Sequence, residues 1–188
     1  MVAMELPGDP EIRGITSDSR AVQPGFLFAV LKGVRRDGAD FIEDALSRGA
    51  AALLTGPDAS MVGNIGIPIL TSPNPRRSYA LLAAKFYGKQ PKSIAAVTGT
   101  NGKSSVVSFL RQIWCLNGHS AASLGTLGLE SELASTPLGH TTPDPAVIHA
   151  HLARLSADGV EHVAIEASSH GLDQHRMDGV RVHMAGFT

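Results

Sequence analysis

The sequence predicts an α/β protein whose second half folds as a doubly wound sheet of mainly parallel strands. Short apolar runs alternate along the chain with longer runs of helical periodicity, and glycine or proline bounds most of them. The apolar run 94–98 leads through a glycine turn directly into a helical run at 103–117. Strands joined by helices of this length form right-handed βαβ crossovers, which build a parallel sheet covered on both faces.

The first half is expected to form a small α/β domain. Its helical runs end at glycines, and the second begins with an Asn cap followed by proline; they span 39–48 and 74–87. Its strand-like runs are short, apolar and flanked by breakers; they span 26–30, 51–55 and 67–71. The polar, breaker-rich segment 88–92 then predicts a boundary between a first domain, residues 1–88, and a second, residues 89–188.

The second half restarts as a parallel α/β unit. Strands are predicted at 94–98, 121–128, 160–167 and 180–188, with helices at 103–117 and 145–157 and a polar loop containing 140–144. The last strand stops at Thr188, where loops normally begin to carry chemistry. A complete protein rarely ends there, so we expect the chain to be an N-terminal fragment.

Composition excludes several classes of partner. The 16 basic and 17 acidic residues nearly balance, which predicts binding to neither nucleic acid nor an anionic membrane. No apolar run approaches the roughly 18 residues of a membrane span, and no secretory signal pattern begins the chain. The single cysteine, Cys115, lies on an apolar helical run and fits a reducing compartment. We therefore expect a cytoplasmic monomer with a packed thiol.

The segment that follows strand 94–98 predicts a nucleotide phosphate site. Glycines allow the backbone to curl around phosphate oxygens, and a helix N-terminus attracts anions. Lys103 can reach the β- and γ-phosphates, and the Ser104 hydroxyl can ligate Mg²⁺. The turn is a shorter variant of the usual phosphate loop, because Val97 stands where that pattern has its first glycine. The residues expected to hold ATP are Gly99, Thr100, Asn101, Gly102, Lys103, Ser104 and Ser105; the plain alternative is a glycine turn without a ligand.

Glu166 ends an otherwise apolar strand, and a carboxylate at the carboxyl end of a parallel strand faces the crevice where ligands bind. Beside a phosphate loop, we expect Glu166 to anchor Mg²⁺ together with Ser104, with Lys103 and Glu166 as the catalytic pair. The alternative is a surface carboxylate at a strand end. The following loop offers Ser168, His170, Gln174 and Arg176 to an anionic ligand, and the Arg176 fork suits phosphate or carboxylate best.

Two further groups of polar residues leave alternatives open. All eight histidines follow residue 118, but their spacings match no zinc motif, which favours solvated or hydrogen-bonded histidines. In the first half, residues 16–20 (TSDSR) could cap a turn or bind a polar ligand. The loop 32–38 (KGVRRDG) is either solvated or meets a second phosphate group.

Four segments together carry a family resemblance. They are SDSRAVQPGFLFAVLKGVRRDGADFI, AAVTGTNGKSS, GHTTPD and AIEASSHGLDQHR, and from first to last they span residues 17–176, most of the chain. In this order they resemble the Mur ligases, the ATP-dependent amide-forming enzymes of peptidoglycan synthesis, and within that family the MurE type. The resemblance implies a uridine-binding N-terminal domain followed by the first part of a central P-loop ATPase domain. It also implies ATP and Mg²⁺ as cofactors.

The implied reaction joins a diamino acid to UDP-N-acetylmuramoyl-L-alanyl-D-glutamate through an acyl phosphate. By resemblance, meso-diaminopimelate is favoured over L-lysine. Residues carried over to the uridine diphosphate are Ser17, Ser19, Val34, Arg35 and Arg36. Residues carried over to the muramoyl dipeptide are Thr141, Thr142, Ser168, Gln174 and Arg176.

The sequence departs from the family pattern at two positions, and three alternative functions stay open. Ser104 keeps the hydroxyl where threonine is usual, while His140 stands where a related enzyme carries asparagine. Three features of the family are expected beyond Thr188: its metal-binding histidine, its modified lysine and its amino-acid-selecting domain. His183 is not that histidine. The chain alone should therefore be inactive. The rivals are a MurF-type D-Ala-D-Ala ligase, a folylpolyglutamate synthetase and a non-catalytic nucleotide-binding module.

Overall fold

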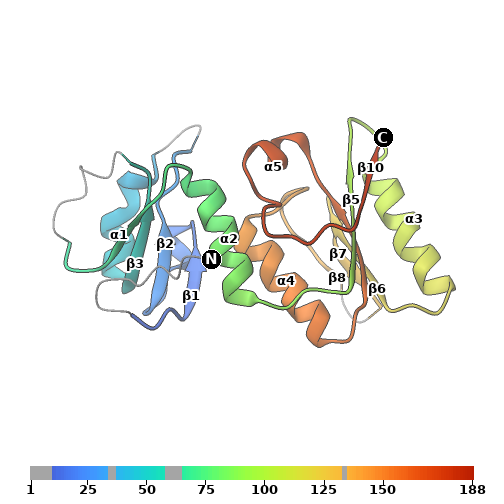
Figure 1. Cartoon of the computed structure of the whole chain (residues 1–188), viewed down its shortest axis with the longest axis horizontal. Coiled ribbons are helices and arrows are strands. Elements are labelled where there is room, and N and C mark those ends of the chain that lie inside the picture. The colour runs from blue at the N-terminus through green and yellow to red at the C-terminus, as the bar shows by residue number, and fades with distance from the viewer. Residues whose placement is uncertain (1–9, 34–36, 58–64, 133–134) are drawn as a thin grey trace. The chain divides into compact units, whose positions relative to one another are not determined.

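The computed structural model describes residues 10–33, 37–57, 65–132 and 135–188 (Figure 1). Val34, Arg35 and Arg36, which the resemblance assigns to the uridine diphosphate, lie outside the described residues. The chain divides into two compact units, Met1–Leu82 and Ala83–Thr188, each of which contains one sheet. The mixed α/β class predicted from the sequence is confirmed.

The first unit is built on a four-stranded parallel sheet in the order β1-β2-β3-β4. Its strands are β1 (Gly14–Thr16), β2 (Phe26–Ala29), β3 (Ala50–Thr55) and β4 (Ile69–Thr71). Its helical segments are η1 (Ser19–Ala21), η2 (Gly38–Phe41) and α1 (Ile42–Ser47), and α2 (Pro75–Tyr87) continues past the division between the units.

The predicted strands of this unit are confirmed with bounds that differ by one or two residues, but β1 was not predicted. Three residues of Gly-Ile-Thr are too few to display a strand period. The predicted helix 39–48 begins with a 3-10 turn, whose amide at Ala39 is capped by the side chain of Asp37. The core beneath consists of apolar side chains from β2, β3 and α1, including the buried Phe28, Leu53 and Ala45.

The second unit contains a six-stranded sheet in the order β10-β5-β9-β6-β7-β8. The first four strands are parallel, and β7 and β8 extend the sheet as an antiparallel edge. The strands are β5 (Ser93–Thr98), β6 (Ala121–Gly125), β7 (Gly128–Ser131), β8 (Ser135–Thr136), β9 (His162–Glu166) and β10 (Met184–Phe187). The helices are α3 (Lys103–Leu116), α4 (Pro145–Ala157) and α5 (Ser169–Asp173).

Alternate residues of the central strands pack against different helices. Val97 and Ala164 form a cluster with Val107 of α3. Their chain neighbours Ala96 and Ile165 instead join the larger cluster that includes Leu152 of α4. Because successive side chains of a strand point to opposite faces, α3 and α4 cover the two faces of the sheet. This arrangement confirms the predicted doubly wound sheet.

Three predictions for the second unit need correction. The predicted strand 121–128 is two antiparallel strands, because Thr126 and Leu127 form a tight turn between β6 and β7. The loop after Glu166 contains the short helix α5, which begins at the side-chain cap of Ser168. The terminal strand is limited to Met184–Phe187.

The predicted domain boundary at 88–92 stays a prediction. The two units divide between Leu82 and Ala83, inside α2, and the predicted boundary lies just after the same helix. Among the described residues, no helix is long and apolar enough to cross a membrane.

Candidate functional site

The glycine turn between β5 and α3 has the backbone geometry that its sequence predicts. Gly99 and Gly102 have φ angles of 131° and 82°, which L side chains rarely adopt. The first intrahelical hydrogen bond of α3 runs from Val106 N to Gly102 O at 2.9 Å. The amides of residues 103–105 precede that bond, so they lie at the positive end of the helix, where anions are stabilised.

Lys103 folds back over this turn. Its Nζ donates hydrogen bonds to the carbonyls of Gly99 (2.7 Å) and Thr100 (3.2 Å). The ammonium group therefore already lies above the loop, where a phosphate chain would replace the two carbonyls as its partners. Ser104 is half-buried at the start of α3, and Ser105 is exposed.

The last residue of the chain closes one side of the loop. Thr188 N donates to Thr98 O at 2.9 Å, and Thr188 O accepts from Thr100 N at 3.3 Å. A side-chain Cβ on Gly99 would lie only 1.9 Å from Thr188 O. Glycine at this position is therefore required by close backbone approach as well as by its φ angle.

Glu166 lies at the carboxyl end of β9, next to the strand that leads into the loop. In the sheet, Glu166 lies opposite Val97 of β5, two positions before Gly99. The side chain is 2% exposed, so the alternative of a solvated surface carboxylate is wrong. Oε1 accepts a hydrogen bond from Thr126 N (2.8 Å) and Oε2 accepts one from Thr126 Oγ1 (3.2 Å).

Thr126 is a site residue that the sequence reading missed. It occupies the turn between β6 and β7, and Gly125 before it leaves room for the Glu166 carboxylate, since a Cβ there would lie 2.1 Å from Oε1. The sequence does contain a signal for Thr126, because this residue directly follows an apolar strand. The same position at a strand end is what identified Glu166. Reading 121–128 as one strand concealed it.

A second group of polar residues converges on the backbone beside Glu166. The buried Thr142 hydroxyl donates to Glu166 O (2.9 Å), pairs with Ser168 Oγ (3.0 Å) and accepts from Ser168 N (2.9 Å). Arg176 Nη1 donates to Thr142 O at 2.7 Å. A guanidinium has five N–H groups, so this bond fixes Arg176 while leaving donors for an anion. The structure thus brings Thr142, Ser168 and Arg176 together, while their predicted role in substrate binding stays a prediction.

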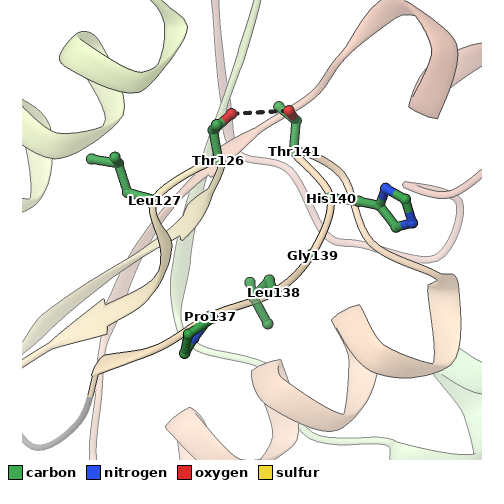
Figure 2. A pocket seen from close by; sticks show the side chains of 7 residues that line it. All are labelled: Thr126, Leu127, Pro137, Leu138, Gly139, His140 and Thr141. Atoms are coloured by element: carbon green, nitrogen blue, oxygen red, sulfur yellow. Dashed lines mark hydrogen bonds between the residues drawn. The ribbon is translucent and has the colours of Figure 1, made fainter.

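Thr141 joins the two groups. Its hydroxyl lies 2.9 Å from Thr126 Oγ1, at one end of a cavity of about 320 Å³ (Figure 2). The cavity is lined by the turn after β6 and the segment after β8, namely Thr126, Leu127, Pro137, Leu138, Gly139, His140 and Thr141. Figure 2 shows the His140 ring directed away from the threonine pair.

Gln174 is not part of this network. Its amide donates to the neighbouring Asp173 carboxylate at 3.1 Å, beyond the end of α5. His175 follows with a φ of 56°, an uncommon conformation that turns the chain toward Arg176. The predicted substrate role of Gln174 stays a prediction.

In the first unit, Ser17 and Ser19 flank Asp18 between β1 and η1. Asp18 accepts hydrogen bonds from Arg20 N (3.0 Å) and from the Arg20 guanidinium (2.9 and 2.7 Å), which lower the pKa of its carboxyl. Ser19 is buried, and its hydroxyl forms a hydrogen bond with the Asp44 carboxylate. This hydrogen bond, together with one from Arg48, lowers the pKa of the Asp44 carboxyl. The interpretation of this segment as a turn cap is confirmed for Asp18, whereas a ligand role for Ser17 and Ser19 stays a prediction.

The residues beside the loop fit the groups that a magnesium nucleotide would bring. The turn offers two glycines without side chains, a helix N-terminus and a cation, which suit a phosphate chain. Ser104 and Glu166 offer oxygen ligands, the type that Mg²⁺ prefers, and each carboxylate oxygen can accept a second partner beside Thr126.

Comparison with known proteins gives matches along most of the chain. The family model described as "Mur ligase family, catalytic domain" matches residues 11–87, and "Mur ligase middle domain" matches residues 97–188. The chain is 55% identical over 181 residues to the UDP-N-acetylmuramoyl-L-alanyl-D-glutamate--2,6-diaminopimelate ligase of Brucella melitensis. It is 52% identical over 186 residues to the protein of the same name from Caulobacter vibrioides.

These alignments cover 96% of this chain but only 37% and 38% of the two relatives, so the chain spans little more than a third of their length. A solved structure of a ligase with that name superposes with a TM-score of 0.82 and 28% identity over 94% of this chain and 36% of its own. The MurF ligase of Thermotoga maritima, solved in complex with ADP, gives a TM-score of 0.60 at 22% identity over 93% of this chain and 36% of its own, which shows a shared fold.

Proposed function

This chain belongs to the Mur ligase family, and from that premise we propose that it is part of an ATP-dependent ligase that adds a diamino acid to UDP-N-acetylmuramoyl-L-alanyl-D-glutamate. The names of the relatives at 55% and 52% identity support 2,6-diaminopimelate as the amino acid. One observation carries the proposal: the glycine loop and the buried Glu166 end neighbouring parallel strands, beside the Thr142–Ser168–Arg176 group.

In the proposed reaction the glutamyl carboxylate accepts the γ-phosphoryl group of ATP and ADP leaves. The amine then attacks the acyl phosphate, forms the amide bond, loses a proton and releases phosphate. The glycine loop binds and orients the phosphate chain, and Lys103 leaves its two carbonyl partners to neutralise charge on the β- and γ-phosphates. Mg²⁺, when bound, supplies further neutralisation of the phosphate charge. Ser104 and Glu166 are the residues that would hold it.

The threonine-rich edge of the site suits the sugar-peptide substrate. Thr141 and Thr126 present hydroxyls at one end of the cavity, and Arg176 is held by Thr142 with donors to spare for a carboxylate. Holding the carboxylate in line with the phosphate chain replaces a bimolecular encounter by a local one, which is a large part of the rate gain of such enzymes. In the first unit, Ser17 and Ser19, with Val34 to Arg36, are proposed to bind the uridine diphosphate.

The MurF-type rival is less well supported. Solved MurF structures share the fold at 18–22% identity, whereas the similarity to the diaminopimelate ligases extends to sequence. The deciding experiment supplies the whole gene product that contains this chain with Mg-ATP and the UDP-muramoyl dipeptide. Parallel reactions receive diaminopimelate or L-lysine, and a third supplies D-Ala-D-Ala with the UDP-muramoyl tripeptide.

Mass spectrometry of the products and phosphate release give the readout. We expect product with diaminopimelate and its loss in Glu166→Gln, while the exposed Lys89→Ala serves as the matched control at wild-type rate. Product only with D-Ala-D-Ala would replace the proposal by the MurF activity. ATP binding without any product would favour a non-catalytic module.

A further inference from the structure

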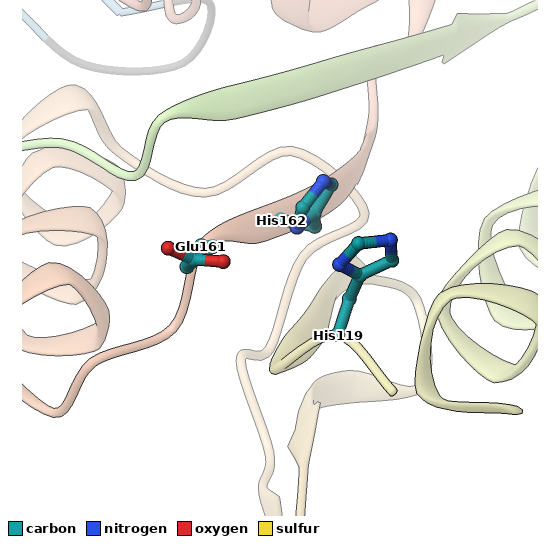
Figure 3. A group of neighbouring side chains, drawn as sticks. All are labelled: His119, Glu161 and His162. Carbon is teal, nitrogen blue, oxygen red and sulfur yellow. The ribbon is translucent and has the colours of Figure 1, made fainter. Parts of the chain in front are cut away.

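A cluster of three potential metal ligands lies at the other end of the second unit's sheet. One ring nitrogen each from His119 and His162 and one carboxylate oxygen of Glu161 all lie within 4.8 Å of one another. Figure 3 shows that they come from two segments, the turn after α3 and the start of β9. Glu166, at the carboxyl end of the same five-residue strand, is about 13 Å away at 3.3 Å per residue, so this cluster is separate from the nucleotide site.

The backbone holds the two segments firmly in register. Ser120 O accepts hydrogen bonds from both Glu161 N (3.1 Å) and His162 N (3.2 Å). On the other side, His119 N donates to Trp114 O at 3.0 Å, which ties the turn to the end of α3. The three side chains therefore extend from fixed points, and forming a site requires only side-chain rotation.

One ring nitrogen of His162 is buried and lacks a hydrogen-bond partner in the described part of the chain. The His162 ring lies 4.6 Å from that of His119 and 5.1 Å from that of Trp114, between centroids. His162 Nδ1 is buried and has no hydrogen-bond partner among the described residues. A buried polar atom without a partner is costly in a native structure and calls for a ligand or a compensating contact.

The ionisation of the group suits a metal ion. Burial, followed by the neighbouring His119, lowers the pKa of His162, so its imidazole is neutral near neutral pH, the form that metals bind. The Lys92 ammonium lowers the pKa of Glu161, which keeps the carboxylate ionised. Lys92 bonds one oxygen, Oε1, and the Lys92 side chain is 80% exposed, so this ion pair is weak and leaves Oε2 available.

We infer that His119, Glu161 and His162 form a binding site for a borderline divalent transition-metal ion, with Zn²⁺ as the representative. Two imidazoles and one carboxylate match the ligand preference of Zn²⁺, whereas Mg²⁺ and Ca²⁺ prefer oxygen ligands alone. Tetrahedral coordination needs ligand atoms about 3.3 Å apart, so the side chains must close by no more than about 1.5 Å. A bound ion would cross-link the end of α3 to the start of β9.

This site could not be predicted from the sequence, because His119 and His162 are 43 positions apart and match no zinc spacing. Their proximity follows from the pairing of β6 with β9, where Ala121 lies opposite His162.

The test is a zinc titration of the tag-free chain against a chromophoric chelator near neutral pH. We expect one equivalent to bind, and His119→Ala and His162→Gln each to weaken binding by about tenfold or more. The exposed His170→Gln is the matched control and should leave the affinity unchanged. Lys92→Ala should tighten binding, because it frees Oε1 and removes a positive charge; a purely structural ion pair predicts no such gain.

Two further readouts identify the site independently. Co²⁺ should give visible absorption bands that His119→Ala abolishes, and Zn²⁺ should raise the melting temperature of the wild type but not of that variant. His119 lies on an exposed turn, so this variant keeps the test valid even if His162→Gln fails to fold. Absence of saturable binding, equal affinity in wild type and His119→Ala, or an equal loss in His170→Gln would overturn the inference.

Discussion

At the carboxyl end of β9, the buried Glu166 carboxylate accepts one hydrogen bond from Thr126 on each of its two oxygens. The carboxyl end of an apolar parallel strand predicts that Glu166 faces the ligand crevice, and the structure places it beside the strand that leads into the glycine loop. The two hydrogen bonds from Thr126 could not be predicted, because Thr126 is 40 residues distant and lay within a misread strand. The position of a residue at a strand end can be inferred from the neighbouring sequence. Its side-chain partners cannot, because they depend on the order of the strands in the sheet.

The first prediction concerns the Thr126 hydroxyl. Thr126→Val keeps the shape of the side chain but leaves Oε2 of the buried Glu166 without that partner. We expect the free energy of unfolding to fall by about 1–3 kcal/mol. Urea denaturation measures it, with Thr71→Val on the exposed end of β4 as control, expected within about 0.5 kcal/mol of wild type. An effect no larger than the control's would mean that the hydrogen bond is dispensable.

The second prediction uses the buried His149. Its Nε2 lies 3.1 Å from Asp178 O, and burial lowers the pKa of His149 below its usual value of 6.5. The unfolded chain therefore binds a proton first as the pH falls below about 6.5, so stability is present above that pH and is lost as the pH falls toward the folded pKa.

Replacing His149 by glutamine should make this loss of stability smaller. Denaturation at about pH 7.5 and about pH 5.5 gives the difference for wild type, His149→Gln and the exposed control His170→Gln. We expect a smaller difference in His149→Gln alone. The same difference in all three proteins would assign the pH dependence to other groups.

At the scale of elements, helices with clear capping residues in the sequence were predicted correctly, whereas several very short helices and strands were not. Helix α4 is marked in the sequence by Asp144 before Pro145, and the structure has the Asp144 side chain accepting from Ala146 N at 2.9 Å. By contrast, α5 depends on Ser168, whose hydroxyl is shared with Thr142, 26 residues earlier. A five-residue helix held by a distant partner has no sequence period to detect.

The third prediction tests the cap of α4. Asp144→Ala removes the side-chain acceptor for the first turn and should lower the free energy of unfolding by about 0.5–2 kcal/mol. The matched change at the other end, Asp158→Ala, breaks only an exposed pair with Arg154 at 3.7 Å and should cost less than about 0.5 kcal/mol. Equal losses from both variants in urea denaturation would show that the cap does not stabilise the helix.

At the scale of the whole molecule, the two-part layout could be predicted because breakers separate two runs of strands and helices. The boundary predicted at 88–92 stays a prediction; the two compact units divide between Leu82 and Ala83, inside α2, and a continuous helix contains no breaker that would mark such a division. The family models match residues 11–87 and 97–188 and leave a gap around the predicted junction.

The fourth prediction follows from that layout. Residues 1–88 retain all of α2 and the four-stranded sheet, so they should unfold cooperatively by themselves. NMR chemical-shift changes on adding UDP should concentrate near Ser17 and Ser19. A non-cooperative transition would refute the independent domain, and shifts elsewhere in the fragment would refute the uridine site.

The central proposal is that the glycine loop of the second unit binds a nucleotide, and calorimetric titration of the chain with Mg-ATP tests it most directly. Lys103→Ala removes the cation that lies over the loop, and Lys89→Ala removes an exposed one outside it. We expect saturable binding that Lys103→Ala weakens by about tenfold or more and Lys89→Ala leaves unchanged. Equal affinity of Lys103→Ala and wild type for Mg-ATP would contradict it.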